Sequence, residues 1–107
     1  MNENLRFFHL LSVIERKHGL SELDAAARAI LDLVIEREVR GERTTAGDLI
    51  GAATISRASV YRKIAELKSR GCIKESWDDY QLVYSAGDGV AAIFEDLSTV
   101  IGRAKVD

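Results

Sequence analysis

The sequence SRASVYRKIAELKSRG, residues 56–71, decides the fold. Ser56 is a favoured first residue for a helix, because its hydroxyl can accept from a free backbone N–H of the first turn. Gly71 is a favoured stop, because glycine readily takes the left-handed conformation that ends helices. Between them, apolar residues recur at helical spacing as Val60, Ile64 and Leu67. The stretch therefore predicts one helix with one buried side.

Basic and hydroxyl side chains lie away from that buried side, mostly toward the start of the helix. Such a front end suits the major groove of DNA, where base edges are read by hydrogen bonds. We expect base contacts from Arg57, Ser59 and Arg62, and phosphate contacts from the lysines. The predicted DNA-binding residues are Ser56, Arg57, Ala58, Ser59, Arg62, Lys63, Lys68 and Lys74. The alternative is an ordinary amphipathic helical hairpin.

The residues before this helix predict a second, shorter helix. Thr45 and Asp48 have the spacing of an N-terminal capping box, with Asp in place of the usual Glu. The run TAGDLIGAATISRASVYRKIAEL, residues 45–67, resembles a bacterial helix-turn-helix. Its Ser-Arg-x-Ser-Val-x-Arg segment at 56–62 resembles the start of a recognition helix in the MarR family of winged helix-turn-helix regulators. That resemblance implies a cytoplasmic, homodimeric transcription regulator that binds pseudo-palindromic DNA, with an unidentified small-molecule effector as a further possibility.

A β-hairpin is predicted directly after Gly71, where a winged helix carries its wing. Residues 72–76 and 80–84 are typical of strands, and residues 77–79 of a turn. The acidic tip would repel phosphate, so either the wing stays off DNA or Lys74 alone supplies its contact. We expect Trp77 to pack against the protein. We expect Cys72 to pack inward as a small apolar residue, with a redox-sensing thiol as the alternative.

The flanking segments predict longer helices. One covers residues 5–17, and a second begins with Ser21 as its cap and ends at Gly41. The charged residues 36–40 of that second helix are expected to form a solvated face. A last helix is expected to open with a Ser85-x-x-Asp88 box. The first and last helices carry more apolar residues than one face can hold, which predicts a homodimer. Its interface is expected to contain Leu5, Phe8, Leu11, Ile93, Phe94, Leu97, Val100 and Ile101.

Length and charge are consistent with one small DNA-binding domain. The net charge of the 107 residues is −2, but residues 54–74 contain six basic side chains and one acidic one. Positive charge is thus concentrated on the predicted reading element. A single cysteine, and the lack of a secretory signal or a long apolar run, predict a cytoplasmic protein. No catalytic or metal-ligand spacing is present, so we expect no enzyme activity, metal or cofactor.

Together these features predict a mainly α fold with a small β wing, a winged helix-turn-helix with flanking dimerisation helices. The expected function is sequence-specific binding of double-stranded DNA as a transcriptional regulator, with repression as the expected mode. One alternative is a winged-helix protein–protein adaptor, which the acidic wing and the net charge favour. Another is a phage or plasmid replication or partition factor that uses the same motif. The single domain, residues 1–107, is divided into N-terminal helices (4–40), helix-turn-helix and wing (44–84) and C-terminal dimerisation helix (85–102).

Overall fold

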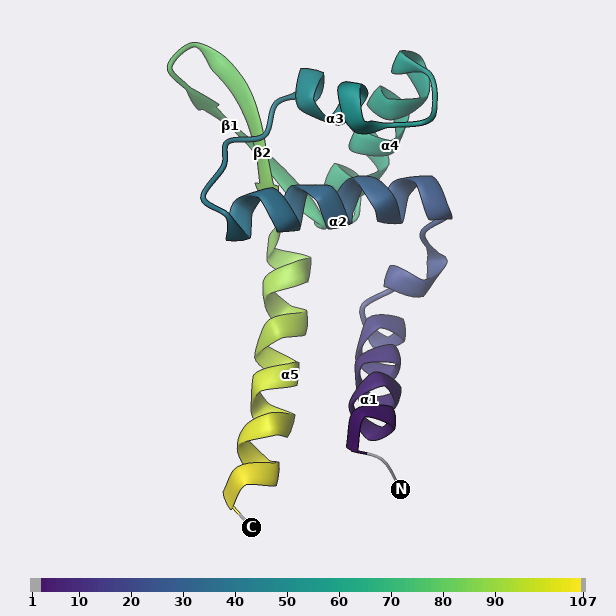
Figure 1. The fold of residues 1–107 in the computed structure, drawn as a ribbon, viewed down its shortest axis with the longest axis vertical. Helices are drawn as coiled ribbons and strands as arrows, with labels where there is room; N and C mark the ends of the chain where they lie inside the picture. Colours follow the sequence, from purple (N-terminus) through teal and green to yellow (C-terminus); the bar gives the residue numbers. More distant parts are fainter. Residues whose placement is uncertain (1–2, 107) are drawn as a thin grey trace.

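The computed structural model describes the backbone of residues 3–106 and the side chains of residues 5–6, 9–93 and 95–99. Helix α2 lies across the middle of the molecule (Figure 1). Helices α3 and α4 and the hairpin lie on one side of it, and α1 and α5 extend from the other side as two stems. The elements are α1 (Glu3–Lys17), a 3-10 turn (Leu20–Glu22), α2 (Ala25–Val39), α3 (Ala46–Ala52), α4 (Arg57–Ser69), β1 (Ile73–Asp78), β2 (Gln81–Ala86) and α5 (Asp88–Val106).

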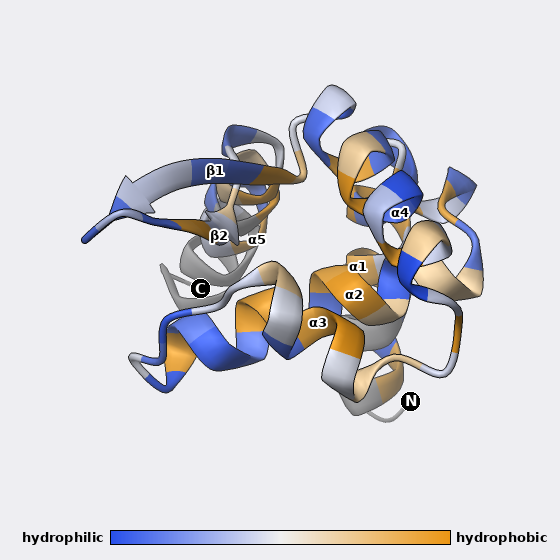
Figure 2. Ribbon diagram, turned by 90° about the horizontal axis from the view of Figure 1, so that it is seen from above, coloured by the Kyte–Doolittle hydropathy of each residue, from blue (hydrophilic) through white to orange (hydrophobic). Residues whose placement is uncertain are grey.

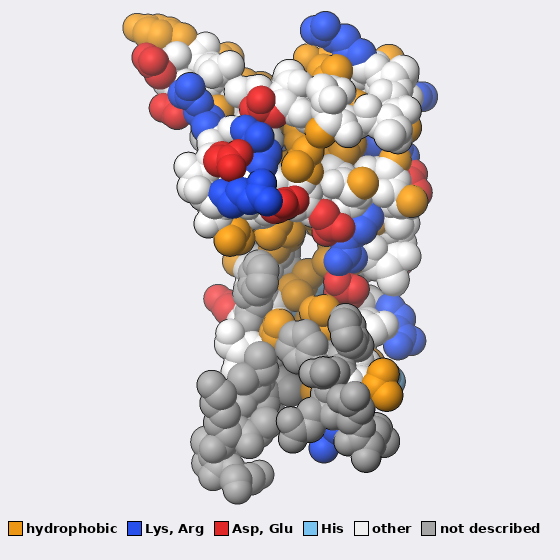
Figure 3. Space-filling model, in the orientation of Figure 1, with side chains coloured by type: hydrophobic (Ala, Val, Ile, Leu, Met, Phe, Trp, Pro, Cys, Tyr) orange, Lys and Arg blue, Asp and Glu red, His pale blue; other side chains and the backbone are white. Residues whose placement is uncertain are grey.

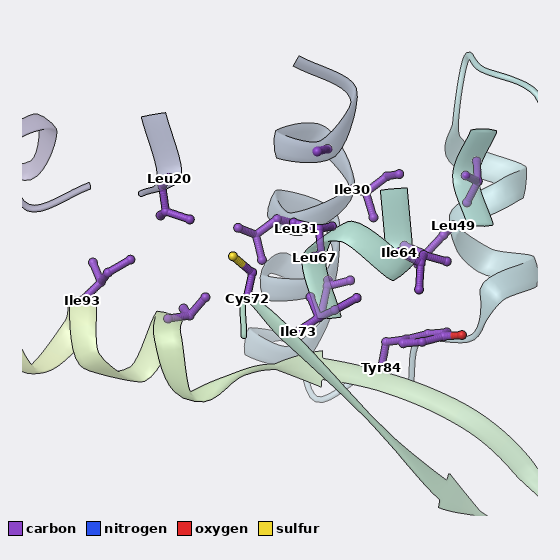
Figure 4. Packing of buried hydrophobic residues seen from close by; sticks show 14 of the residues in the cluster. Leu20, Ile30, Leu31, Leu49, Ile64, Leu67, Cys72, Ile73, Tyr84 and Ile93 are labelled. Carbon is purple, nitrogen blue, oxygen red and sulfur yellow. The ribbon is translucent and has the colours of Figure 1, made fainter. Parts of the chain in front are cut away.

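The core lies where α2, α3, α4 and the hairpin meet. Val60, Ile64 and Leu67 are buried, which confirms the apolar stripe predicted for α4. They pack with Leu31 and Leu49 in one cluster of buried side chains, drawn in part in Figure 4. Burying a side chain of this size contributes roughly 1.5–3 kcal/mol to folding. The core therefore fixes which side of α4 remains available to a ligand.

The expected start of α2 was wrong. Asp24, not Ser21, is the N-cap, and its Oδ1 accepts from the backbone N–H of Ala27 at 2.8 Å. Leu20 is buried and anchors the 3-10 turn, so the chain reaches the helix three residues later than the local pattern predicts. The end of α2 is as expected, because Gly41 adopts φ 75° directly after the capping Arg40.

The hairpin is longer than predicted, and its turn begins two residues later, at Asp79. Asp78 pairs with Gln81, so Asp79 and Tyr80 form the turn. Both have positive φ, 53° and 65°, as a two-residue type I′ turn requires. The usual sequence signal for this turn ends in glycine, and Tyr80 does not supply it. Trp77 was expected to pack inward, but it is 74% exposed near the wing tip.

The junction between the wing and α5 depends on a close backbone contact. Ser85 belongs to β2, so the predicted Ser85–Asp88 box is absent and α5 begins at Asp88. The N–H of Gly87 donates to the carbonyl of Cys72 at 2.8 Å. A Cβ on Gly87 would lie 2.3 Å from the carbonyl oxygen of Gly71. Only glycine fits there, and this contact sets where α5 leaves the winged core.

Candidate nucleic-acid interface

The exposed start of α4 is ordered by hydroxyl groups. The Ser56 hydroxyl caps the helix by accepting from the N–H of Ser59 at 3.2 Å, as predicted. The same hydroxyl donates to Ser59 Oγ at 2.9 Å. Arg62 Nη2 donates to Ser59 Oγ, also at 2.9 Å. The Arg62 side chain is therefore held along the exposed side of the helix rather than left free in solvent.

A second arginine is held by an aromatic ring. The Arg57 guanidinium lies over the Tyr61 ring, 5.8 Å from its centre, a distance at which cation–π attraction is significant. Ala58 is exposed beside it. We call Arg57, Ala58, Ser59 and Arg62 the front face of α4. In Figure 3, one group of Lys and Arg side chains, at the upper right of the molecule, stands apart from acidic ones.

The other cations of α4 are paired with carboxylates. Lys63 Nζ contacts Asp24 at the start of α2, and this bond raises the pKa of Lys63 and lowers that of Asp24. Lys68 pairs with Glu75 of β1, and Arg70 with Glu22 at 3.1 Å. These pairs tie α4 to its neighbours.

Phosphate binding by Lys63 or Lys68 stays a prediction. Either lysine would have to exchange its carboxylate for a phosphate. Within residues 5–6, 9–93 and 95–99, no carboxylate lies within ion-pair distance of Arg57 or Arg62.

The wing flanks the helix-turn-helix and projects from the body (Figure 2). Lys74 is exposed on β1, opposite Ser85. Tyr80 is 98% exposed at the tip. Asp78, expected to repel phosphate, accepts from Arg43 Nη1 at 3.1 Å. Half of the acidic tip is thus neutralised within the chain itself.

The stems carry part of the predicted dimer surface. Leu5 is 62% exposed, and Leu11 is half-buried. Ile93 is buried in the chain's own core, and Leu97 packs against it, so both offer little surface to a partner. Asp96 accepts from His18 Nε2 at 2.8 Å and from Lys17 at 3.1 Å, which joins the two stems. The side chains of Phe8, Phe94, Val100 and Ile101 lie outside the described residues.

The sequence interpretation missed the role of Arg37. Residues 36–40 were expected to form a solvated charged face, yet Arg37 Nε donates to the buried Thr44 hydroxyl at 3.1 Å. Glu38 is exposed, yet its carboxylate accepts from the N–H of Ala86 at 3.0 Å. No sequence signal distinguishes these charges from their solvated neighbours Glu36 and Arg40, because their partners lie on other elements.

Within the described part of the chain, no cluster of His, Cys, Asp and Glu side chains could hold a metal ion. None of the helices there is long and apolar enough to cross a membrane. Cys72 is buried, as expected, and burial raises the pKa of its thiol. A raised pKa disfavours the reactive thiolate.

No protein-family model and no curated protein sequence matches the chain. Solved structures do share its fold. TubR bound to 24 bp of tubC from Bacillus thuringiensis serovar israelensis has a TM-score of 0.60 at 16% identity, covering 80% of this chain and 92% of that one. Oxidized MarR from E. coli has a TM-score of 0.57 at 15% sequence identity, and the match covers 92% of this chain and 74% of that one. A third structure is the homodimeric winged helix-turn-helix DNA-binding domain Mb0332 from Mycobacterium bovis. Its TM-score is 0.55 at 18% sequence identity, and the match covers 90% of this chain and 85% of that one.

The chain is therefore a winged helix-turn-helix protein, mainly α with a two-stranded wing, as predicted. Within that class its fold is MarR-like, which confirms at the level of fold the resemblance seen in residues 56–62. Residues 42–45, just before the helix-turn-helix, belong to no helix or strand. That segment is bonded to β2 through the Tyr84 N–H and the Thr44 carbonyl, at 2.9 Å.

Proposed function

We propose that this chain is a transcriptional regulator that binds double-stranded DNA sequence-specifically as a homodimer in the cytoplasm. The observation that carries the proposal is the front face of α4. It presents two ordered and exposed arginines, Arg57 and Arg62, in the first turns of the helix. The DNA complex of TubR and the homodimeric DNA-binding domain Mb0332, which share the fold, support it.

The chemistry of the front face suits base reading. An arginine can donate two hydrogen bonds to O6 and N7 of guanine, which is worth roughly 1–3 kcal/mol of discrimination against another base. Ala58 leaves room for the helix to approach the groove floor, and the Ser59 hydroxyl can donate or accept. Lys74 is exposed on the strand that follows, which supports a phosphate contact from its side chain. Occupying a promoter in this way would repress transcription, which we propose as the mode of action.

A salt titration tests the proposal. Sites would be selected from a library of random duplexes, and binding to the best duplex would be followed by fluorescence anisotropy at increasing salt. We expect affinity to fall steeply and linearly on logarithmic axes, because phosphate contacts release counterions. A scrambled duplex is the control and should bind more weakly at every salt concentration. Absence of DNA binding at any salt would overturn the proposal.

The protein–protein adaptor remains the second candidate, because the wing tip exposes Trp77 and Tyr80 beside Asp79. Asp79→Asn separates the two functions. For a DNA regulator, removing this charge should leave affinity for DNA unchanged or raise it slightly, because a wing with less negative charge repels phosphate less. A partner protein that recognises the tip would lose affinity instead. A replication or partition factor would read DNA with the same front face, and the identity of the selected sites distinguishes it from a regulator.

A further inference from the structure

Residues 42–44, which we call the strap, lie between α2 and α3 and contact both strands of the wing. One side chain from the last turn of α2 contacts the whole strap. Arg37 Nε donates to Thr44 Oγ1 at 3.1 Å, and Nη2 donates to the carbonyl of Arg43 at 2.7 Å. Nη1 lies 3.2 Å from the Glu42 carboxylate. The planar guanidinium presents its donors in a fixed fork, so these contacts define the path of the strap.

The same guanidinium reaches the helix-turn-helix. Arg37 Nη2 lies 3.3 Å from Asp48 Oδ2. That carboxylate is half of the capping box, and it accepts from the Thr45 N–H at 2.9 Å. Arg37 therefore stabilises the start of α3 as well as the strap before it.

The strap in turn holds the wing. The Thr44 carbonyl accepts from the Tyr84 N–H of β2 at 2.9 Å. Arg43 Nη1 donates to Asp78 of β1 at 3.1 Å. Thr44 is only 2% exposed, so its hydroxyl depends on Arg37 for a hydrogen-bond partner. In Figure 3 the mixed acidic and basic side chains gather over this end of α2.

We propose that Arg37 is a positioning residue that sets the spacing between wing and helix-turn-helix before DNA arrives. The inference rests on the proposed function. The Arg37 side chain is 24% exposed and turned toward the strap, so it acts through the strap rather than by touching DNA. A preset spacing lowers the cost of ordering the wing on binding. Lysine cannot replace it, because an ammonium group lacks the planar fork.

The test compares Arg37→Ala and Arg37→Lys with Arg40→Ala, a matched control three residues away. Arg40 pairs with Glu36 of its own helix, so its loss removes the same charge without freeing the strap. Hydrogen exchange of the Tyr84 N–H reports directly on the bond between strap and wing. We expect exchange to be at least about tenfold faster in both Arg37 variants and unchanged in Arg40→Ala. DNA affinity should fall about tenfold with an unchanged salt slope, because no phosphate contact is lost.

Unchanged exchange of the Tyr84 N–H in Arg37→Ala would overturn the inference. Parent-like exchange in Arg37→Lys would also overturn it, because only the charge of residue 37 would then matter. Should Arg37→Ala fail to fold, Thr44→Val removes the Nε acceptor while nearly keeping the side-chain shape. It should give the same faster exchange, and normal exchange there would count against the inference. A wild-type protein that binds no DNA would overturn the proposed function, while Tyr84 exchange would still decide whether Arg37 holds the wing.

Discussion

Two arginines of α4 differ from its other cations in how they are held. Arg62 rests on a serine hydroxyl and Arg57 on an aromatic ring. Among the described residues, no carboxylate forms an ion pair with either arginine, so neither has to break such a pair before it contacts a base or a phosphate. Lys63, by contrast, would have to give up its bond to Asp24. We therefore expect the base contacts to come from the first turns of the helix.

Replacing Arg62 tests that assignment. We expect Arg62→Ala to abolish sequence-specific binding, because a bidentate guanine contact contributes roughly 1–3 kcal/mol of discrimination. The helical circular dichroism should be unchanged, since Arg62 is exposed. Arg70→Ala is the control, because Arg70 lies at the far end of α4 and pairs with Glu22. Parent-like affinity of Arg62→Ala for the selected duplex would show that the reading face is elsewhere.

The capping box of α3 makes stability depend on pH. The Thr45 N–H donates to the Asp48 carboxylate and holds its pKa below the ordinary 3.8. A carboxylate whose pKa is lower in the folded state stabilises the fold above its unfolded pKa, and this contribution is lost as pH falls through the folded value. Hydrogen bonds from Lys63 and from His18 lower the pKa values of Asp24 and Asp96 in the same direction.

Thermal melts at several pH values measure this effect. We expect the melting temperature to fall steeply on acidification below about pH 4, where these carboxylates take up protons. Asp48→Asn should lower the melting temperature at neutral pH. On acidification its melting temperature should fall less than that of the parent, because the amide does not titrate. A variant whose acid profile parallels that of the parent would contradict the assignment. Asp79→Asn, which changes an exposed carboxylate at the wing turn, serves as the control.

At the scale of elements, the wing carries strain at its turn. Tyr80 has φ 65° and is 98% exposed, so it adopts a left-handed conformation without burying its ring. For a residue other than glycine, such a conformation costs on the order of 1–2 kcal/mol. The hairpin tolerates this cost because its six paired residues on each strand and the bond to the strap determine the register.

Glycine at the turn should therefore stabilise the protein. We expect Tyr80→Gly to raise the free energy of unfolding by up to about 1 kcal/mol, because relief of strain exceeds the added freedom of the unfolded chain. Tyr80→Ala is the matched control, since it removes the same ring but keeps a Cβ in the left-handed region. Calorimetry of the three proteins measures the difference. Equal stability of the Gly and Ala variants would show that the turn is not strained.

At the scale of the whole molecule, the α1 stem leaves apolar surface uncovered. Leu5, Leu10 and Val13 of α1 are between 36% and 62% exposed. The proposed homodimer would cover this surface about a two-fold axis. The same axis would present two copies of α4 to major grooves about one helical turn apart.

Val13→Asp tests the dimer more cleanly than a change at Leu97, because Leu97 packs against the chain's own core. We expect the parent to sediment as a dimer at micromolar concentration and Val13→Asp to sediment near 11.8 kDa, the mass of one chain. DNA affinity should fall with dissociation, because two half-sites are no longer bound together. Val39→Asp is the control, an 81% exposed valine at the end of α2. A parent that sediments as a monomer would contradict the model.

The sequence by itself determined the features that depend on neighbours within one helical turn. The caps at Thr45 and Ser56, the stop at Gly71 and the buried stripe of α4 are all as predicted, because their hydrogen bonds and spacing are local. Only the tertiary structure decided which charges are paired. Arg37 and Arg40 look alike along the chain, yet one holds the strap and the other pairs within its own helix. The partners of Arg37 lie outside its own helix, on the strap and on α3, and their distances depend on how the core packs the elements together.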